Sequence, residues 1–530
     1  MGVKRKLLFA IPVIIIFVVL FGNIGVLVFG NTGETYSTST QDLEIARASE
    51  IIELKNGDRF DLSIDIIKKE IAGKTIKMFG YNGQIPGPLL KVEQNSHIYI
   101  TVTNNLDTET TVHWHGLRLD NAFDGNPGVT MKSQQPGESF EYKLDFVDEG
   151  IYWYHPHVRE DYQQELGLYG NILVSPLQDG YYNNVNKEIP IILDDILIEG
   201  EGLFPFFLDF GNHGMGGRWG NIMLINGDDN YNLEVSTGEV IRFYITNVAN
   251  TRVFNFSIPN APIKLIGSDI GSYEKEEFVD SVIISPSERY TIEVIFENQG
   301  EYLLKSITPE NEYTLGKITV SGENLNSEND HSEEFFSLGE NEFVKEDIDN
   351  FRQYFDKEVD VNIKLSLIVN GLGNLFSNGD RDSTDNDWIK VQAGNPDKIE
   401  WEDPEPIFNK QVKTSDRTWI LKDTNTGKIN DEIDLIFKVG DIVKIRIFND
   451  ESISDAMQHP IHIHGQRFLV IEKNGIKNEN LVWKDTVLVP IGSYVDILLD
   501  VTNPGNWMMH CHIAEHLTSG MKTHIHVTEN

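Results

Sequence analysis

The sequence predicts an all-β protein built from three repeated antiparallel β-sandwich domains and preceded by a membrane-spanning helix at the N-terminus. Three observations support this prediction. Short segments of alternating residues, such as 98–102 (IYITV) and 443–448 (VKIRIF), recur between Asn, Gly and Pro turns. A pattern of turns and paired positions occurs three times along the chain. A long uncharged and largely apolar run occupies residues 7–29.

Length and charge restrict the possible functions before any motif is considered. The chain has 530 residues, more than one β-sandwich needs, and its hydrophobic share of 40% is ordinary for a protein with a packed core. Asp and Glu number 82 against 44 Lys and Arg, so the formal net charge is −38. Such a field repels phosphate backbones and attracts cations, and we therefore expect no nucleic-acid partner.

The N-terminus resembles that of an exported protein. Lys4, Arg5 and Lys6 precede the uncharged run, which is long enough to cross a hydrocarbon core of about 30 Å. No clear small-x-small cleavage site follows it. We therefore expect residues 1–44 to form an uncleaved membrane anchor, with the body of the protein at the cell surface or in the periplasm. A cleaved signal peptide, which would make the protein secreted, is the alternative.

An internal repeat organises the rest of the chain. Each copy has an Asn at its opening turn (Asn82, Asn226, Asn430), an Asn at the end of a strand (Asn104, Asn247, Asn449) and a Gly after a proline turn (Gly150, Gly300, Gly505). Three diverged copies of one sandwich are the simplest explanation. The predicted domains are 45–180, 181–321 and 358–530, with an acidic, solvated linker at 322–357 between the last two.

Histidines occupy two equivalent positions of this repeat. The first position reads His113-Trp114-His115, Phe254-Asn255-Phe256 and His462-Ile463-His464, and the second reads His155-Pro156-His157, Lys305-Ser306-Ile307 and His510-Cys511-His512. Alternate side chains of a strand point to one face, so each His-x-His pair directs two imidazoles towards one point. The pattern predicts a metal cluster shared by the first and third domains, with the middle domain as a spacer.

The last of these clusters indicates which metal is bound. Cys511, the one cysteine of the chain, lies between two of the paired histidines, and His516 and Met521 follow it. His459, at the end of a strand in the same domain, is the natural second imidazole. One thiolate, two imidazoles and a distant thioether describe a blue-copper site for electron transfer.

Four motifs resemble the copper signatures of the three-domain multicopper oxidases, the family of laccases and copper-efflux oxidases: HWHG (113–116), HPH (155–157), HPIHIHG (459–465) and HCHIAEHLTSGM (510–521). The resemblance covers residues 45–530 and implies three Greek-key, cupredoxin-like sandwiches with four copper ions. It assigns the type 1 copper to His459, Cys511, His516 and axial Met521. It assigns the type 2 copper to His113 and His462, and the type 3 pair to His115, His155 and His512 on one ion and His157, His464 and His510 on the other.

The resemblance also implies an activity. Four one-electron oxidations of a donor are coupled to the reduction of O2 to two waters, and Cys511 links the type 1 copper to the other three ions. Two carboxylates match the positions of the family's proton donors: Asp124, in the segment DGNPG, and Glu515, beside His516. We expect the protein to be a monomer.

The electron donor stays open at this point. An axial methionine implies a modest redox potential, so phenols and metal ions are both expected as donors. The segment Asp455-x-Met457-x-His459 resembles part of the substrate-copper site of copper-efflux oxidases, which makes a dedicated cuprous oxidase the alternative. The chain has only nine Met and no methionine-rich insert of the kind those oxidases carry. A copper-free scaffold and a two-domain nitrite reductase are disfavoured, because every ligand and both halves of the cluster are present.

Overall fold

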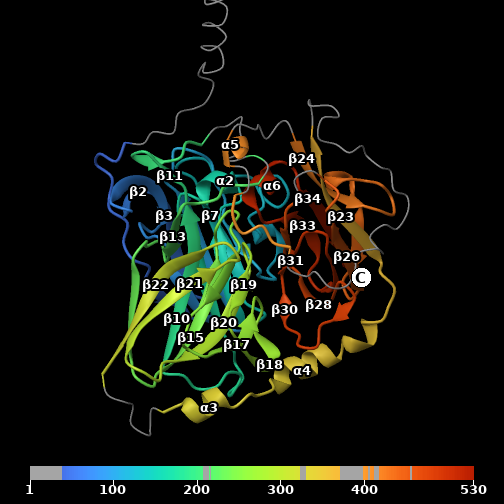
Figure 1. The fold of residues 1–530 in the computed structure, drawn as a ribbon. Coiled ribbons are helices and arrows are strands. Elements are labelled where there is room, and N and C mark those ends of the chain that lie inside the picture. The colour runs from blue at the N-terminus through green and yellow to red at the C-terminus, as the bar shows by residue number, and fades with distance from the viewer. Residues whose placement is uncertain are drawn as a thin grey trace, which may run out of the picture.

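The structure, a computed structural model, describes residues 39–206, 214, 216–322, 330–369, 398–403, 406–410, 417–453 and 456–529. In this part of the chain strands dominate and form three β-sandwiches (Figure 1). The all-β prediction is confirmed. The apolar run 7–29 lies outside the described residues, and within them no helix has the length and apolar character of a membrane span. The N-terminal anchor therefore stays a prediction.

The first sandwich contains nine strands in two sheets. One sheet has the order β3-β2-β5-β7, and the other has the order β1-β4-β9-β8-β6. Their side chains share one hydrophobic cluster. The strands are β1 (Ile51–Glu53), β2 (Arg59–Ile71), β3 (Lys74–Tyr81), β4 (Leu89–Glu93), β5 (His97–Asn104), β6 (His113–His115), β7 (Ser139–Asp145), β8 (Gly150–His155) and β9 (Gly170–Ser175), with the short helices η1 (Asn121–Phe123) and α2 (Glu160–Gln163).

The middle sandwich has the sheets β13-β10-β15-β20-β17-β18 and β14-β22-β21-β16-β19, with the small pair β11-β12 beside them. Its core is a separate hydrophobic cluster. The strands are β10 (Lys187–Ile196), β11 (Ile198–Glu199), β12 (Gly202–Leu203), β13 (Ile222–Ile225), β14 (Tyr231–Ser236), β15 (Val240–Asn247), β16 (Phe254–Ser257), β17 (Ile263–Ser268), β18 (Ser272–Val279), β19 (Val282–Ile284), β20 (Arg289–Ile295), β21 (Gly300–Ile307) and β22 (Glu312–Ser321).

The third sandwich has the sheets β24-β23-β26-β32-β28-β29, with β30 paired to β28, and β25-β34-β33-β27-β31. Its cluster of buried side chains includes Cys511 and Met521. The elements are β23 (Val361–Val369), α5 (Pro406–Asn409), β24 (Arg417–Asp423), η5 (Asn430–Glu432), β25 (Leu435–Lys438), β26 (Ile442–Asn449), β27 (His459–Ile463), β28 (Arg467–Lys473), β29 (Ile476–Lys477), β30 (Trp483–Lys484), β31 (Thr486–Val489), β32 (Tyr494–Asp500), β33 (Gly505–Cys511), α6 (Ala514–Thr518) and β34 (Lys522–Thr528).

Equivalent residues of the three sandwiches adopt equivalent conformations. The turn asparagines Asn82, Asn226 and Asn430 have φ of 50°, 52° and 48°, and the glycines that open β8, β21 and β33 have φ of 141°, 141° and 139°. The strand-end asparagines are each fully buried, and each donates two side-chain hydrogen bonds to backbone oxygens of neighbouring loops or strands: Asn104, Asn247 and Asn449. The repeat seen in the sequence is therefore a repeat of backbone geometry.

The segment between the second and third sandwiches differs from the predicted solvated linker. It contains α3 (Ser332–Phe336), α4 (Glu342–Asp349) and η2 (Arg352–Tyr354). Asn341 caps α4 by accepting hydrogen bonds from the amides of Phe343 and Val344, and Val344 and Ile348 share one buried face. The helix was not predicted, because its few apolar residues, although spaced for a helix, lie in an acidic segment.

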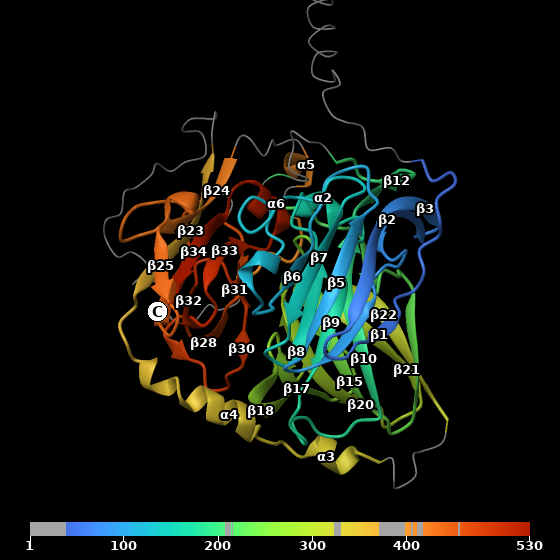
Figure 2. The ribbon, with the colours of Figure 1, turned by 180° about the vertical axis from the view of Figure 1, so that it is seen from behind.

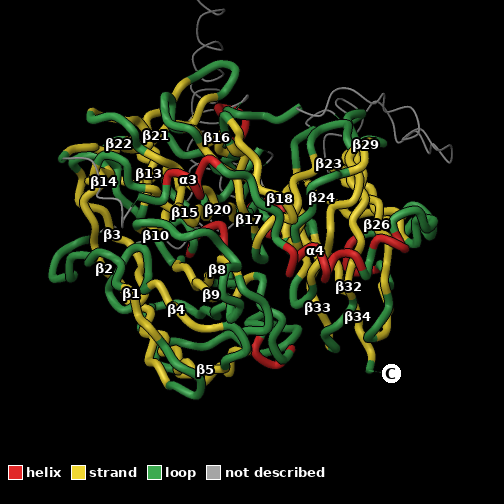
Figure 3. Tube along the Cα trace, turned by 90° about the horizontal axis from the view of Figure 1, so that it is seen from below, coloured by secondary structure: helices red, strands yellow, loops and turns green. Residues whose placement is uncertain are grey.

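The sandwiches surround a common contact region. Figure 2 shows β6 and β8 of the first sandwich on the side that faces β31 and β33 of the third. Figure 3, viewed from below, shows α4 running past the junction, beside β18 of the middle sandwich. The histidine strands of the first and third sandwiches are therefore opposite each other, as the predicted shared cluster requires.

Candidate metal centre

Eight imidazoles converge from the first and third sandwiches. His113 and His115 lie on β6, and His155 ends the neighbouring strand β8, where it pairs with His113 across the ladder. In the third sandwich His462 on β27 pairs with His510 on β33 in the same way. The other three follow these strands within two residues: His157, His464 and His512. All eight are buried.

The two sandwiches build the cluster jointly. His115 stacks on His462 with ring centroids 3.7 Å apart, and His113 stacks on His464 at 4.0 Å. Each contact joins a residue of the first sandwich to one of the third. In the middle sandwich the equivalent positions hold Phe254 and Phe256, both fully buried in its core. Among the described residues of the middle sandwich, no histidine joins the cluster.

Three sets of imidazoles bring one nitrogen each within 4.8 Å of the others: His115, His155 and His512; His157, His464 and His510; and His113, His115 and His462. The first two sets are those that the resemblance assigns to the type 3 ions, and the third contains the type 2 pair. In the second set the Nε2 atoms of His464 and His510 are 3.1 Å apart. A metal ion about 2.0 Å from both atoms would have an N–metal–N angle of about 100°, so both nitrogens can bind the same ion.

Unpartnered nitrogens provide a test of whether these residues fit a metal. Among the described residues, four imidazoles have no hydrogen bond at Nε2, while an oxygen lies between 2.7 and 2.9 Å from their Nδ1: His113 (Asp124 O), His155 (Pro156 O), His157 (Glu160 Oε1) and His462 (Asp485 O). A buried polar atom without a partner is costly, and an imidazole whose other nitrogen is bound to oxygen is oriented as a metal ligand. The donor set fits copper.

His115 has the opposite orientation. Its Nδ1 is the unpartnered nitrogen, and its Nε2 is 3.0 Å from Asp485 Oδ1 and 3.2 Å from Thr486 Oγ1. His115 therefore presents Nδ1 to the cluster, whereas its neighbours on the strands present Nε2.

The environment favours the neutral form of five of these imidazoles. Burial, and then the nearby histidines, lower the pKa well below its ordinary value for five of them: His115, His155, His464, His510 and His512. A neutral imidazole retains the lone pair that a metal needs. His157 differs: burial lowers its pKa, but the carboxylates of Glu160 and Asp124 together raise it, so the net shift is upward.

A second site lies in the third sandwich. Cys511 Sγ is 3.5 Å from His459 Nδ1 and 3.6 Å from His516 Nδ1, and the two nitrogens are 3.2 Å apart. The point equidistant from these three atoms lies about 2.0 Å from each, close to the length of metal bonds to nitrogen and sulfur. All three residues are fully buried, and burial lowers the pKa of His459 to about 3. The arrangement is the trigonal two-imidazole, one-thiolate geometry of a blue-copper site.

Two residues complete the surroundings of this site. The amide of Cys511 donates to the carbonyl of Met521 at 3.1 Å, and the Met521 side chain is buried in the same hydrophobic cluster. Trp419 of β24 stacks on His516 at 4.0 Å and meets His459 edge-on at 5.0 Å. Trp419 could not be predicted from the sequence as part of this site, because a tryptophan in a strand has the pattern of an ordinary core residue.

The two sites are joined through the backbone. Cys511 is bonded to His510 and to His512, and these histidines belong to different imidazole triads. Burial raises the pKa of the Cys511 thiol. A metal cation reverses this preference, because a coordinating thiol is deprotonated.

The predicted proton donors lie in different surroundings. The Asp124 carboxylate is 3.0 and 3.1 Å from His464 Nδ1, so Asp124 touches the cluster directly. Gly125, at φ +83°, makes this possible, because a Cβ there would be 1.9 Å from the carbonyl oxygen of Val112. Glu515 lies further out, where its fully buried carboxylate accepts from Asn250 at 3.5 Å and Thr251 at 3.4 Å. Burial, and then Asp161, raise its pKa to about 8.

The predicted substrate-metal residues are not both described. Asp455 lies outside the described residues. Met457 is buried within the hydrophobic cluster of the third sandwich, and its carbonyl accepts a hydrogen bond from Asn449.

Three further residues that contact the imidazoles escaped the sequence analysis. Glu160 is bound to His157, and its position three residues later, after a His-Pro-His motif, was an available signal. Asp485 and Thr486 contact His115 although they lie about 370 residues away in the chain, so no local sequence pattern predicts these contacts.

Comparisons with known proteins agree with this geometry. Three family models, each described as multicopper oxidase, match residues 65–179, 153–322 and 386–530. The multicopper oxidase Mco of Staphylococcus aureus is 26% identical over 466 residues, covering 86% of this chain and 85% of the relative.

Solved structures share the fold. A multicopper oxidase from Campylobacter jejuni, described as a metallo-oxidase, has a TM-score of 0.67 at 23% identity and covers 93% of this chain and 99% of its own. The laccase-like multicopper oxidase CueO of an Ochrobactrum species has a TM-score of 0.67 at 21% identity, with 91% and 100% covered. These likenesses support cupredoxin-like sandwiches. The family matches together span more than half of the chain and contain both halves of the histidine cluster, and they show that this chain belongs to the multicopper oxidases, copper-dependent oxidoreductases that use O2.

Proposed function

We propose that this protein is a laccase-like multicopper oxidase that takes single electrons from phenols or metal ions and reduces O2 to water. The observation that supports this most directly is the trigonal set of Cys511, His459 and His516, whose cysteine is bonded to a member of each triad. Copper bound at these sites would supply one-electron oxidation of the donor and four-electron reduction of O2.

We propose that His459, Cys511, His516 and Met521 would hold the type 1 copper. His113 and His462 would hold the type 2 copper. The type 3 pair would be held by His115, His155 and His512 on one ion and by His157, His464 and His510 on the other.

The chain itself would contribute orientation, protons and exclusion of water. Backbone and carboxylate oxygens hold the imidazoles at the nitrogen that faces away from the cluster. Asp124 lies close enough to His464 to exchange a proton with groups at the cluster. A raised pKa of about 8 keeps Glu515 protonated at neutral pH, which suits a proton donor.

The nature of the donor is the finer part of the proposal. Thioethers are ligands that select Cu(I), and the side chain of Met457 is buried in the hydrophobic cluster of the third sandwich, which favours the broader activity. The structural relatives include one described as a metallo-oxidase and one described as active on lignin model compounds, so both kinds of donor occur on this fold. A dedicated cuprous oxidase is the alternative.

The setting of the enzyme is also proposed. The basic N-terminal tip and the apolar run that follows support an extracytoplasmic location with an uncleaved anchor, or secretion if the segment is removed. We propose that the protein acts as a monomer, since both halves of the imidazole cluster come from one chain.

Oxygen consumption tests the choice of donor. Rates are measured with Cu(I), Fe(II), Mn(II) and a dimethoxyphenol, for the wild type and for the double variant Asp455→Ala, Met457→Leu. The broad activity predicts that the Cu(I) and phenol rates change by the same small factor. A loss of tenfold or more with Cu(I) alone, about 1.4 kcal/mol, would instead assign the dedicated cuprous activity.

Two controls accompany this experiment. Met78→Leu changes a buried methionine of the first sandwich and reports the general effect of such a substitution. Ionic strength is matched between donors, because a net charge of −38 attracts cations and salt screens this attraction over a Debye length of about 8 Å.

A further inference from the structure

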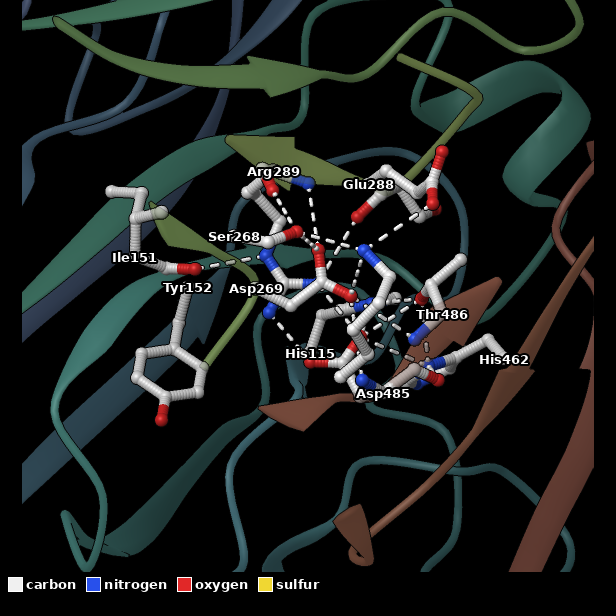
Figure 4. A network of polar contacts seen from close by, with 12 residues as sticks. His115, Ile151, Tyr152, Ser268, Asp269, Glu288, Arg289, His462, Asp485 and Thr486 are labelled. Atoms are coloured by element: carbon white, nitrogen blue, oxygen red, sulfur yellow. Dashed lines mark hydrogen bonds and ion pairs between the residues drawn. The ribbon is translucent and has the colours of Figure 1, made fainter. Parts of the chain in front are cut away.

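A buried network of charges connects the middle sandwich to the imidazole cluster (Figure 4). Arg289, at the start of β20 in the middle sandwich, donates from Nη1 and Nη2 to the two carboxylate oxygens of Asp485 at 2.7 and 2.5 Å. Asp485, between β30 and β31 of the third sandwich, in turn bonds His115 of the first. All three residues are fully buried, so one chain of contacts crosses all three sandwiches.

The network fixes Arg289 and Asp485 on several sides. Arg289 Nε donates to the carbonyl of Ile151 at 2.8 Å, and its amide donates to Asp269 at 2.9 Å. Asp269 also lies 3.3 Å from Nζ of Lys484 and accepts from the amide of Asp485 at 3.3 Å. These contacts hold the guanidinium and the carboxylate in one relative orientation.

The room for this contact depends on the residue after the first histidine motif. Gly116 has φ +86°, and a Cβ at this position would be 2.4 Å from Asp485 Oδ2 and 3.0 Å from Arg289 Nη2. The backbone of the first sandwich thus approaches the Arg289–Asp485 pair so closely that only glycine fits.

We propose that Arg289 is a positioning residue for the copper cluster, because it orients Asp485 so that His115 presents Nδ1 to the metal. The carboxylate of Asp485 accepts a hydrogen bond from Nε2 of His115, so the proton of the neutral imidazole is on Nε2. The lone pair of Nδ1 is then free for a metal. The middle sandwich, whose described residues include no ligand of the cluster, thereby determines which nitrogen of one ligand is used. This inference rests on the ligand assignment proposed above.

An arginine is suited to this role in a way that lysine is not. Its planar fork binds both carboxylate oxygens and sets the rotation of the carboxylate, whereas an ammonium is a point charge that leaves the rotation free. Arg289→Lys therefore keeps the charge and removes the orientation. Removal of an outer partner of a metal ligand costs about 10- to 100-fold in metal affinity or activity.

The experiment uses the copper-loaded full chain and the variant Arg289→Lys. We expect its crystal structure to show His115 turned from Nδ1 towards Nε2 or in two orientations, and its copper content to fall below that of the wild type. Anaerobic bleaching of the blue site by a phenol is expected to stay within twofold of the wild-type rate. Reoxidation by O2 is expected to slow by about 10- to 100-fold.

The matched control is Arg242→Lys. Arg242 is another buried arginine of the middle sandwich, and it bonds Glu293 at 2.6 and 3.2 Å. It reports the cost of weakening a buried ion pair in this domain, and we expect normal copper content and reoxidation. If Arg289→Lys behaves like Arg242→Lys in copper content, His115 orientation and reoxidation, Arg289 is merely structural and the proposal is wrong.

A second variant guards against loss of folding. Arg289→Gln combined with Asp485→Asn removes both charges together, so no unpaired charge is buried. We expect it to recover thermal stability relative to Arg289→Gln but to keep the slow reoxidation, because an amide can turn either its oxygen or its nitrogen towards His115. Recovery of both stability and reoxidation would overturn the proposal. A wild-type protein that holds no copper at the triads would instead contradict the ligand assignment.

Discussion

The Trp419 indole stacks on the His516 imidazole with the rings 4.0 Å apart and inclined by 28°. The same indole meets His459 edge-on, so one side chain covers both imidazoles of the trigonal site. The apolar shell around a metal controls solvent access and thereby the redox potential. We therefore expect Trp419 to limit the access of water to the proposed type 1 site.

Trp419→Ala is expected to lower the type 1 potential by the order of tens of millivolts, because water that enters stabilises the more highly charged Cu(II). The cavity should also cost about 3–5 kcal/mol of unfolding free energy. Redox titration and thermal unfolding measure the two effects. Trp507→Ala, in the same hydrophobic cluster, serves as control and should lose stability without a shift in potential. Equal potentials for the Trp419 variant and the wild type would contradict this role.

Cys511→Ser is expected to abolish both the blue colour and the oxidase activity. The hydroxyl of serine cannot replace the thiolate whose charge transfer to Cu(II) produces the colour. The imidazole triads are left intact, so copper analysis should find one ion fewer per chain than in the wild type. A variant that remains blue would remove Cys511 from the type 1 site.

Met521→Leu is expected to raise the type 1 potential, because loss of the weak axial thioether destabilises Cu(II) relative to Cu(I). Spectroelectrochemical titration of the blue band measures the change. Met78→Leu, a buried methionine of the first sandwich, should leave the potential unchanged. An unchanged or lower potential in the Met521 variant would tell against an axial ligand at this position.

Glu515 makes the copper-free protein less stable as the pH rises. Burial raises its pKa from 4.5 to about 8, so within this window the folded carboxyl holds a proton that the unfolded carboxyl releases. The free energy of unfolding therefore falls from pH 4.5 to pH 8, by roughly 4 kcal/mol in total.

Glu515→Gln should remove this contribution, and urea unfolding of the copper-free protein at pH 5 and pH 8 measures it. The free energy of unfolding of the variant, relative to that of the wild type, should therefore be higher at pH 8 than at pH 5. Glu479→Gln, at an exposed glutamate, is the control and should leave the pH dependence as it is. If the unfolding free energies of the wild type and the variant change with pH in the same way over this range, Glu515 is ionised in the folded protein.

Several features of the site were accessible from local sequence. The spacing of His113 and His115, and of His462 and His464, predicts two imidazoles on one face of a strand, and the structure brings them together. The division of the imidazoles into sets came from the resemblance to a family and not from spacing. The linker helix α4 was missed, because Val344 and Ile348 are few among acidic neighbours.

The sequence by itself determined which repeats carry ligands and which residue types they offer, because strand alternation acts over two residues and a repeat preserves its positions. Only the tertiary structure decided which nitrogen of each imidazole faces the cluster. His115 is oriented by Asp485, 370 residues away, and Asp485 is held by Arg289 of another sandwich. Contacts of this kind form where three separately folded sheets meet, so no local pattern of residues encodes them.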